Sequence, residues 1–241
     1  MPSEALEELT ARRLREYERK IGKPVALPVP VEEVIEQVLD LCILWEDVEE
    51  QRGEMILAGL KRRTRTVVVN EKHLKLFDGK PGLLRSTLGH EAGHWDIECR
   101  PHLGSGSLFG DADDAEVEGM VYRHSSQGSD LIEVLRDLAI HNKEAYRAYR
   151  KLTAGQDTAE QKSNVDRYQS CLLMPRWLME DAAKRFDLRS WPSLYRLAEE
   201  AEVNISNLTT RLRRLKLIHS NDGLKRICLS ASEATGQGSL F

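Results

Sequence analysis

The chain has 241 residues, a charged fraction of 31% and a formal net charge of −4 at pH 7, which describes a globular chain long enough for one large domain or two small ones. The acidic balance argues against nucleic-acid binding over the whole surface, and four cysteines without a C-x-x-C pair exclude a cysteine zinc site and a disulfide framework. No apolar run reaches the roughly 18 residues of a membrane span, and the N-terminal segment lacks the pattern of a signal peptide, so we expect a cytoplasmic protein with no membrane partner.

The first third of the chain predicts two helices and a small sheet. Leucines recur on one side of residues 3–20, which are otherwise rich in charge, and this spacing is typical of an amphipathic helix. Prolines precede a second helix, whose apolar face contains Val34, Val38 and Leu41. Short apolar runs separated by polar turns then predict three strands, within residues 41–48, 54–60 and 65–70.

The central part of the chain is predicted to be mainly helical. Residues 81–98 indicate a helix that begins at a proline. A loop rich in glycine, serine and acid follows, then a short strand, a long helix, and a helix that stops at Pro175. The spacing of Val165, Tyr168 and Leu172 predicts that this last helix buries them. In chain order these segments are 100–114, 116–125, 129–152 and 159–174.

The sequence pattern changes beyond residue 175, where three compact helical patterns on short connections are followed by a strand-like run over residues 224–230. Basic residues outnumber acidic ones there, although the chain as a whole is acidic. We therefore predict an α+β fold with a boundary near residue 175. Its parts are a mostly helical domain with a small β-sheet over 1–175, an all-α module over 176–230 and a frayed tail over 231–241.

The segment TLGHEAGHWDIEC in the predicted central helix contains an H-E-x-x-H motif. His90 and His94 are four residues apart, so on a helix both rings lie on one face and can bind one zinc ion. Glu91 is placed to accept a proton from the attacking water. The small residues Ala92 and Gly93 leave space beside the helix for a substrate. The alternative is that the histidines only pack against or solvate the helix, because a bare H-E-x-x-H also occurs by chance.

Two later segments extend the pattern. The first is YQSCLLMP, residues 168–175, and the second runs from Leu197-Ala198 through Val203 and Ser206 to Arg211-Leu212 and Leu217-Ile218. Together with LGHEAGHW they resemble the ImmA/IrrE family of metallo-endopeptidases. The resemblance implies a zincin-like domain joined to a helix-turn-helix, with zinc bound by His90 and His94 and with Glu91 as the catalytic residue. It also implies a protein substrate, since characterised relatives cleave a helix-turn-helix repressor and so release stress or mobile-element genes.

The third zinc ligand is the part of the site that the motif leaves open. The family places a glutamate on the helix before L-L-M-P, and here that position is Lys162, which cannot bind zinc while protonated. Asp166 lies one turn later on nearly the same face and is the nearest substitute, so we expect it to complete the site. Other candidates are Glu160, Asp111, Asp113, Asp114, Glu116, Glu118 and His124.

Residues 194–215 have the pattern of a helix-turn-helix, with Ser206 as the predicted cap of the second helix. Arg211, Arg213 and Arg214 supply positive charge for DNA phosphates, so they are the candidate nucleic-acid contacts. The alternative is that the module packs against the protease domain or binds protein, with these charges on a solvated face.

The leading prediction is a cytoplasmic, zinc-dependent metallo-endopeptidase that acts on a transcriptional repressor. The competing prediction is a non-enzymatic regulator that retains the protease fold and acts by binding DNA or protein through its helix-turn-helix. Lys162 is the residue that keeps the second prediction open.

Overall fold

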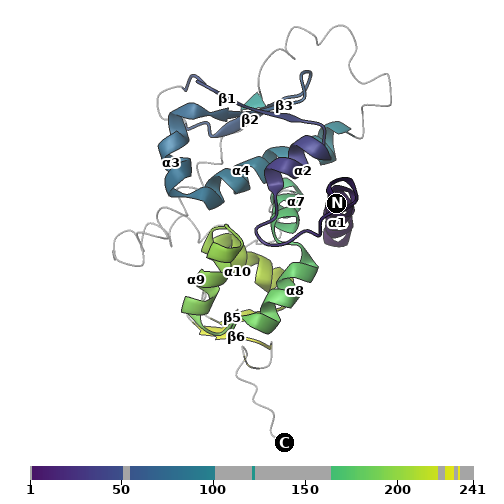
Figure 1. Ribbon diagram of the computed structural model, residues 1–241. Helices are drawn as coiled ribbons and strands as arrows, with labels where there is room; N and C mark the ends of the chain where they lie inside the picture. The colour runs from purple at the N-terminus through teal and green to yellow at the C-terminus, as the bar shows by residue number, and fades with distance from the viewer. Residues whose placement is uncertain are drawn as a thin grey trace, which may run out of the picture.

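The computed structural model describes residues 2–50, 55–100, 121–122, 164–221, 226–230 and 233, and Figure 1 shows how their elements are arranged. The first part contains α1 (Ser3–Ile21), α2 (Val31–Gln37), β1 (Cys42–Glu46), β2 (Ala58–Lys61), β3 (Thr66–Asn70), η1 (Glu71–His73), α3 (Leu74–Gly79), α4 (Pro81–Gly93), η2 (His94–Cys99) and β4 (Val121–Tyr122). The second part contains α7 (Asn164–Leu173), α8 (Arg176–Arg185), α9 (Trp191–Glu200), α10 (Ile205–Arg214), β5 (His219–Asn221) and β6 (Arg226–Cys228). None of the helices in these ranges combines the length and the apolar character needed to span a bilayer.

The elements agree with most of the sequence predictions. α1 covers the first predicted helix, β1 to β3 lie in the three apolar runs, and α8 to α10 are the three compact helices. The predicted helix over 81–98 is present in two sections, because α4 continues at His94 into the π-helical segment η2. The predicted long helix, the acidic loop at 111–118 and nearly all of the tail lie outside the described residues.

Four strands form a mixed sheet in the order β1-β3-β2-β4. β1 runs parallel to β3, and β2 is antiparallel to both β3 and β4. The central strand β3 is buried along its whole length, including Val67, Val68 and Val69, which explains its unbroken β-branched run. The motif helix α4 contacts β2 and lies beneath the sheet in Figure 1, so the sheet covers the helix that carries His90 and continues at His94 into η2.

Two glycines of the motif helix allow α7 to pack against it at short range. A Cβ atom at Gly93 would come within 3.0 Å of Val165 Cγ1 and 3.2 Å of Tyr168 Cδ1, and one at Gly89 within 3.0 Å of Gln169 Cγ. These distances are shorter than ordinary van der Waals contact, so a side chain at either position would push α7 away. The prediction that Gly93 leaves room for a substrate is therefore wrong, because α7 fills that room.

One hydrophobic cluster extends through both parts of the chain. Val165, Tyr168 and Leu172 of α7 are buried, as their spacing predicted. Tyr168 and Leu172 belong to the same cluster as Leu208 of α10. The chain changes direction at Pro175, where we predicted a boundary, yet the segments before and after it pack on a common core.

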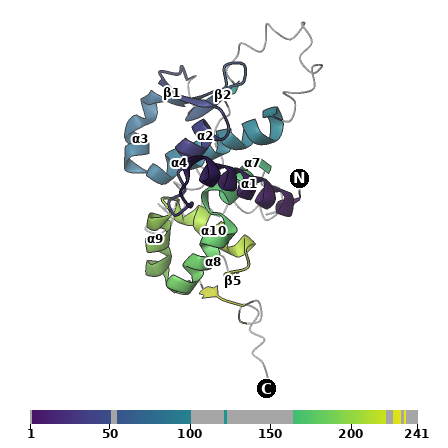
Figure 2. The same cartoon turned by 45° about the vertical axis from the view of Figure 1, so that its right-hand side comes forward.

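We predicted an all-α module after Pro175, and the structure corrects this prediction. α8, α9 and α10 are followed by β5 and β6, which pair antiparallel with His219 opposite Cys228. The β-branched Ile227 is buried in the shared cluster, so the small hairpin covers apolar surface that the three helices alone would expose to water. In Figures 1 and 2 the three helices lie on the side of α7 away from the sheet.

Candidate metal centre

The two motif histidines face each other at the junction of α4 and η2. His90 lies in the last turn of α4, His94 begins η2, and the backbone remains helical through both residues. Their Nε2 atoms are 3.1 Å apart, and the rings meet edge to face. A tetrahedral zinc ion with Zn–N bonds of about 2.0–2.1 Å separates two nitrogen ligands by roughly 3.3 Å. The observed separation is therefore close to the one that a single zinc ion requires.

Each histidine also contacts a carboxylate through its other ring nitrogen. Asp166 Oδ1 lies 3.2 Å from His90 Nδ1, and Glu98 Oε2 lies 3.0 Å from His94 Nδ1. An ionised carboxylate only accepts hydrogen bonds, so the hydrogen bond between Glu98 and His94 places a hydrogen on Nδ1 of His94 and leaves a lone pair on its Nε2 when the ring is neutral. A lone pair on each of the two Nε2 atoms, 3.1 Å apart, would repel unless a cation or a shared proton lies between them.

The histidine pair is accessible from the side of His90. His94 is buried, whereas the side chain of His90 is 29% exposed and that of Asp166 is 37% exposed. Glu91 is buried in the same turn of α4 as His90. The site thus combines a solvent-facing side with a buried carboxylate that directly follows the first histidine.

Asp166 lies on α7 beside the histidine pair, but its contact is with Nδ1 of His90 and not on the side of the Nε2 atoms. Its role as the third ligand stays a prediction. Within the described ranges, no group of three or more His, Cys, Asp or Glu side chains is arranged to hold a metal ion. Lys162 and the other candidates for the third ligand, which are Glu160, Asp111, Asp113, Asp114, Glu116, Glu118 and His124, lie outside those ranges.

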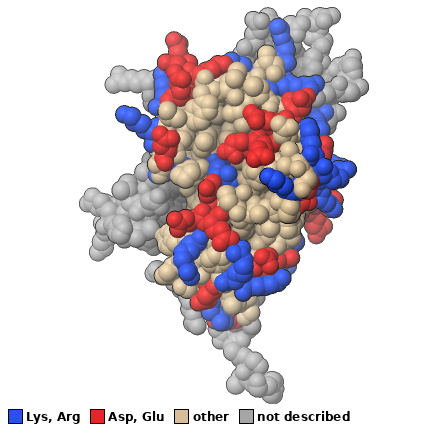
Figure 3. Space-filling model, in the orientation of Figure 1, with Lys and Arg blue, Asp and Glu red and all other residues tan. Residues whose placement is uncertain are grey.

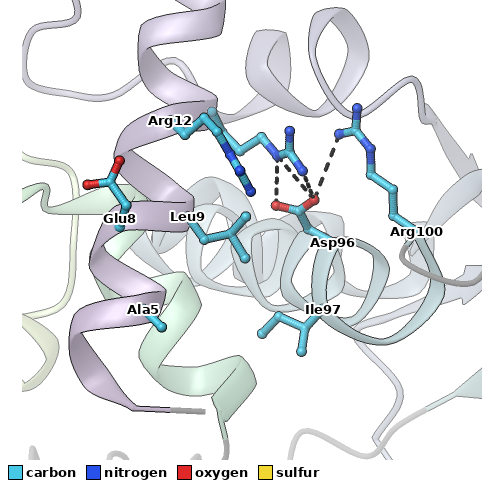
Figure 4. Close-up of a pocket in the computed structure, with 8 residues that line it drawn as sticks. Ala5, Glu8, Leu9, Arg12, Asp96, Ile97 and Arg100 are labelled. Atoms are coloured by element: carbon cyan, nitrogen blue, oxygen red, sulfur yellow. Dashed lines mark hydrogen bonds and ion pairs between the residues drawn. The ribbon is translucent and has the colours of Figure 1, made fainter.

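A buried ion-pair network joins the motif helix to α1 and α7. Asp96, two residues after His94, accepts hydrogen bonds from Nε and Nη2 of Arg13 and, at 3.0 Å, from the hydroxyl of Tyr168. Figure 4 shows Asp96 between α1 and η2, with dashed lines that also reach Arg100. Burial and the adjacent Asp96 charge raise the pKa of Tyr168 well above its ordinary value, so this hydroxyl keeps the proton that it donates.

Asp96 and Glu98 were not among the predicted site residues, although each follows a detectable pattern. Asp96 stands between the apolar residues Trp95 and Ile97, and an acidic residue in such surroundings needs a partner if it is buried. Glu98 follows His94 by four residues, the spacing that brings side chains together on one face of a helix. Neither pattern identifies the residues, distant in the chain, that Asp96 and Glu98 contact.

The three arginines that we predicted to contact DNA have different surroundings. Arg211 is 2% exposed, and its guanidinium donates to both carboxylate oxygens of Glu7 and to the carbonyl of Met174. This burial corrects the assignment of Arg211 to a phosphate contact, because its charge is already paired inside the protein. Arg213 is exposed and Arg214 is partly buried, and for these two the DNA contact stays a prediction.

The second helix of the predicted helix-turn-helix packs against the motif helix. Asn204 is the N-cap of α10, so Ser206 lies inside the first turn and is not the cap that we predicted. Asn207 donates a hydrogen bond to Ser86 of α4 at 3.1 Å, and a Cβ atom at Gly82 would come within 3.0 Å of the backbone nitrogen of Asn204. The first turn of α10 therefore faces α4. In Figure 3 basic and acidic side chains alternate over the visible face of the lower, C-terminal part.

The fold and the site define a mixed α/β protein with a pair of facing histidines on a helix beneath a small sheet. No model of a protein family matches the chain, and no curated protein matches it. The grounds for a function are the geometry of the histidine pair and the motif residues that carry the resemblance.

Proposed function

We propose that the chain is a cytoplasmic zinc metallo-endopeptidase, with a zincin-like domain and a helix-turn-helix module, that cleaves a helix-turn-helix transcriptional repressor. The observation that carries the proposal is the facing pair of Nε2 atoms on His90 and His94, 3.1 Å apart, with each ring held by a carboxylate at Nδ1. The four-residue spacing brings the two side chains together on the helix, and the 3.1 Å separation of their Nε2 atoms is in addition close to that of two ligands of one zinc ion. The substrate class, and its setting in a stress or mobile-element response, come from the resemblance to the ImmA/IrrE family.

Two of the ligands that a zinc site needs face each other, and the residues around them would divide the chemistry. His90 and His94 would hold the ion through Nε2. Zinc, when bound, supplies a Lewis acid that makes water more acidic and polarises a peptide carbonyl. Glu91 accepts the proton of the attacking water and passes it to the leaving amine. The partly exposed His90 is the side of the pair from which a substrate would approach.

Asp166 has two possible roles, which one variant separates. As the third ligand, its carboxylate would leave His90 Nδ1 and bind the metal directly. As the structure places it, the carboxylate orients the ring of His90. Asp166→Asn should weaken zinc binding by more than about 100-fold if Asp166 is a ligand, and should leave it close to the wild-type value if the side chain only orients His90, because the amide oxygen can still accept from Nδ1.

Zinc content and proteolysis test the proposed function. The purified chain should contain roughly one zinc ion, as a single site requires, and His94→Ala should lose most of it. Glu91→Gln should keep the metal and lose cleavage of a repressor substrate, because it removes the proton acceptor and not a ligand. Equal and negligible zinc in the wild type and in His94→Ala would end the enzyme proposal. A Glu91→Gln variant that still cleaves would remove Glu91 from the mechanism.

A second candidate function is a regulator that keeps this fold without cleaving protein. It is favoured by Lys162 at the position of the family's glutamate. The burial of Arg211 and the packing of α10 on α4 favour protein binding over DNA binding for such a regulator. A wild-type chain that binds a repressor tightly, contains no zinc and leaves the repressor intact would select this candidate.

A further inference from the structure

We infer that Glu98 is a positioning residue of the metal centre, which holds the ring of His94 so that Nε2 faces His90. Its importance for zinc binding rests on the proposed function, whereas the orientation of the ring does not depend on a metal. Glu98 is outside the H-E-x-x-H motif, and the resemblance described above assigns it no role.

The contact geometry sets the orientation of the His94 ring. Glu98 Oε2 lies 3.0 Å from His94 Nδ1, and the opposite nitrogen of the ring lies 3.1 Å from His90 Nε2. Since a carboxylate cannot donate, the shared hydrogen belongs to Nδ1. The neutral ring is therefore held in the tautomer whose free lone pair lies on Nε2, the tautomer that a metal ligand needs at this position.

Glu98 also forms an ion pair with a residue next to the sheet. Arg62, in the connection between β2 and β3, places Nη2 3.8 Å from the same Oε2 atom that contacts His94. The side chains of Glu98 and Arg62 are 36% and 37% exposed, so a substitution at Glu98 leaves no buried charge behind. An effect of such a substitution on the His94 ring can therefore be measured in a folded protein.

The size of the loss in zinc affinity, together with the number of atoms bound to zinc, distinguishes a positioning residue from a metal ligand. Loss of a carboxylate that hydrogen-bonds a metal-bound histidine typically weakens metal binding about 10–100-fold. Loss of a direct ligand removes a donor atom from the metal, which X-ray absorption at the zinc edge detects as one fewer nitrogen or oxygen neighbour. A mere surface pair at four-residue spacing would change neither the tautomer of His94 nor the affinity for zinc.

The first experiment uses the metal-free, full-length protein and reads the tautomer of His94 by long-range proton–nitrogen NMR of the histidine rings. The wild type should show the hydrogen of His94 on Nδ1. Glu98→Ala should lose this preference, and Glu98→Gln should retain it, because the amide oxygen still accepts from Nδ1. Glu46→Ala is the matched control, since Glu46 is similarly exposed, at 39%, and pairs with Lys61 away from both histidines. A His94 ring that keeps its hydrogen on Nδ1 in Glu98→Ala would overturn the inference.

The second experiment measures the zinc dissociation constant by competition with a chelating indicator. Glu98→Ala should bind zinc about 10–100-fold more weakly than the wild type, while Glu98→Gln and Glu46→Ala should stay close to it. An unchanged constant in Glu98→Ala, or the loss of a zinc neighbour in its absorption spectrum, would also overturn the inference. A wild type that binds no zinc but shows the tautomer change would defeat the proposed function and leave the positioning role of Glu98 in place.

Discussion

Asp96→Ala is expected to destabilise the protein strongly, because Asp96 is the common partner of three elements. Its side chain is inaccessible to solvent, and that of its partner Arg13 is 13% exposed. Removing the carboxylate leaves the guanidinium of Arg13 and the hydroxyl of Tyr168 without the acceptor that they share. Breaking a buried ion pair from one side costs about 3–5 kcal/mol of the free energy of unfolding. The orphaned Tyr168 hydroxyl belongs to the same network, so its cost is part of this figure and is not added to it.

Urea denaturation followed by circular dichroism measures this loss, with Glu8→Ala as the control. Glu8 and Asp96 line one pocket between α1 and η2. Glu8 is 74% exposed and pairs with the exposed Arg15, so its removal should cost at most about 1 kcal/mol. The double variant Arg13→Met/Asp96→Ala should lose less than the sum of the two single variants, because the buried cation disappears together with its partner. An Asp96→Ala protein that loses no more stability than Glu8→Ala would refute the reasoning.

Three further predictions concern the packing of α7, the buried Arg211 and the remaining basic residues. Gly93→Ala should cost about 1–3 kcal/mol of stability in the same urea assay, because the new methyl group would meet Val165 and Tyr168. Gly79→Ala is the control and should be neutral or slightly stabilising, because a Cβ atom there would have no atom within 4 Å. Burial alone would raise the pKa of Glu7, but the hydrogen bond and charge of Arg211 outweigh it and hold this pKa below its ordinary value of 4.5. The unfolded chain therefore binds more protons than the folded one, so this stabilisation is complete above about pH 4.5 and is lost as the pH falls through the lowered value. Arg211→Met should remove that part of the pH dependence, and an unchanged profile would contradict the pairing. Charge reversal at Arg213 and Arg214 should weaken any salt-sensitive binding to duplex DNA in a fluorescence titration, and a wild type without DNA binding at low salt would leave α10 as a packing element.

The sequence by itself determined where the helices and strands lie in the chain and which side chains share a face of each. α1 and α7 follow from apolar spacing, the three strands from short apolar runs and the motif helix from the proline at its start, and all of these are properties of residues close together in the chain. The same local geometry brought His90 and His94 to one face and sent Val165, Tyr168 and Leu172 into the core. These predictions required no knowledge of what lies opposite.

Only the tertiary structure decided the partners of the charged and small residues. The charge of Arg211 suggested a residue on the surface. In the structure it is buried and pairs with Glu7, which is 204 positions away in the chain. Gly93 is small because α7 needs the space, although its neighbours in sequence suggested room for a substrate. Asp96 is a buried acceptor because α1 and α7 both meet η2 at that point. In each case the free energy of the side chain depends on which distant segment covers it, and periodicity carries no information about that segment.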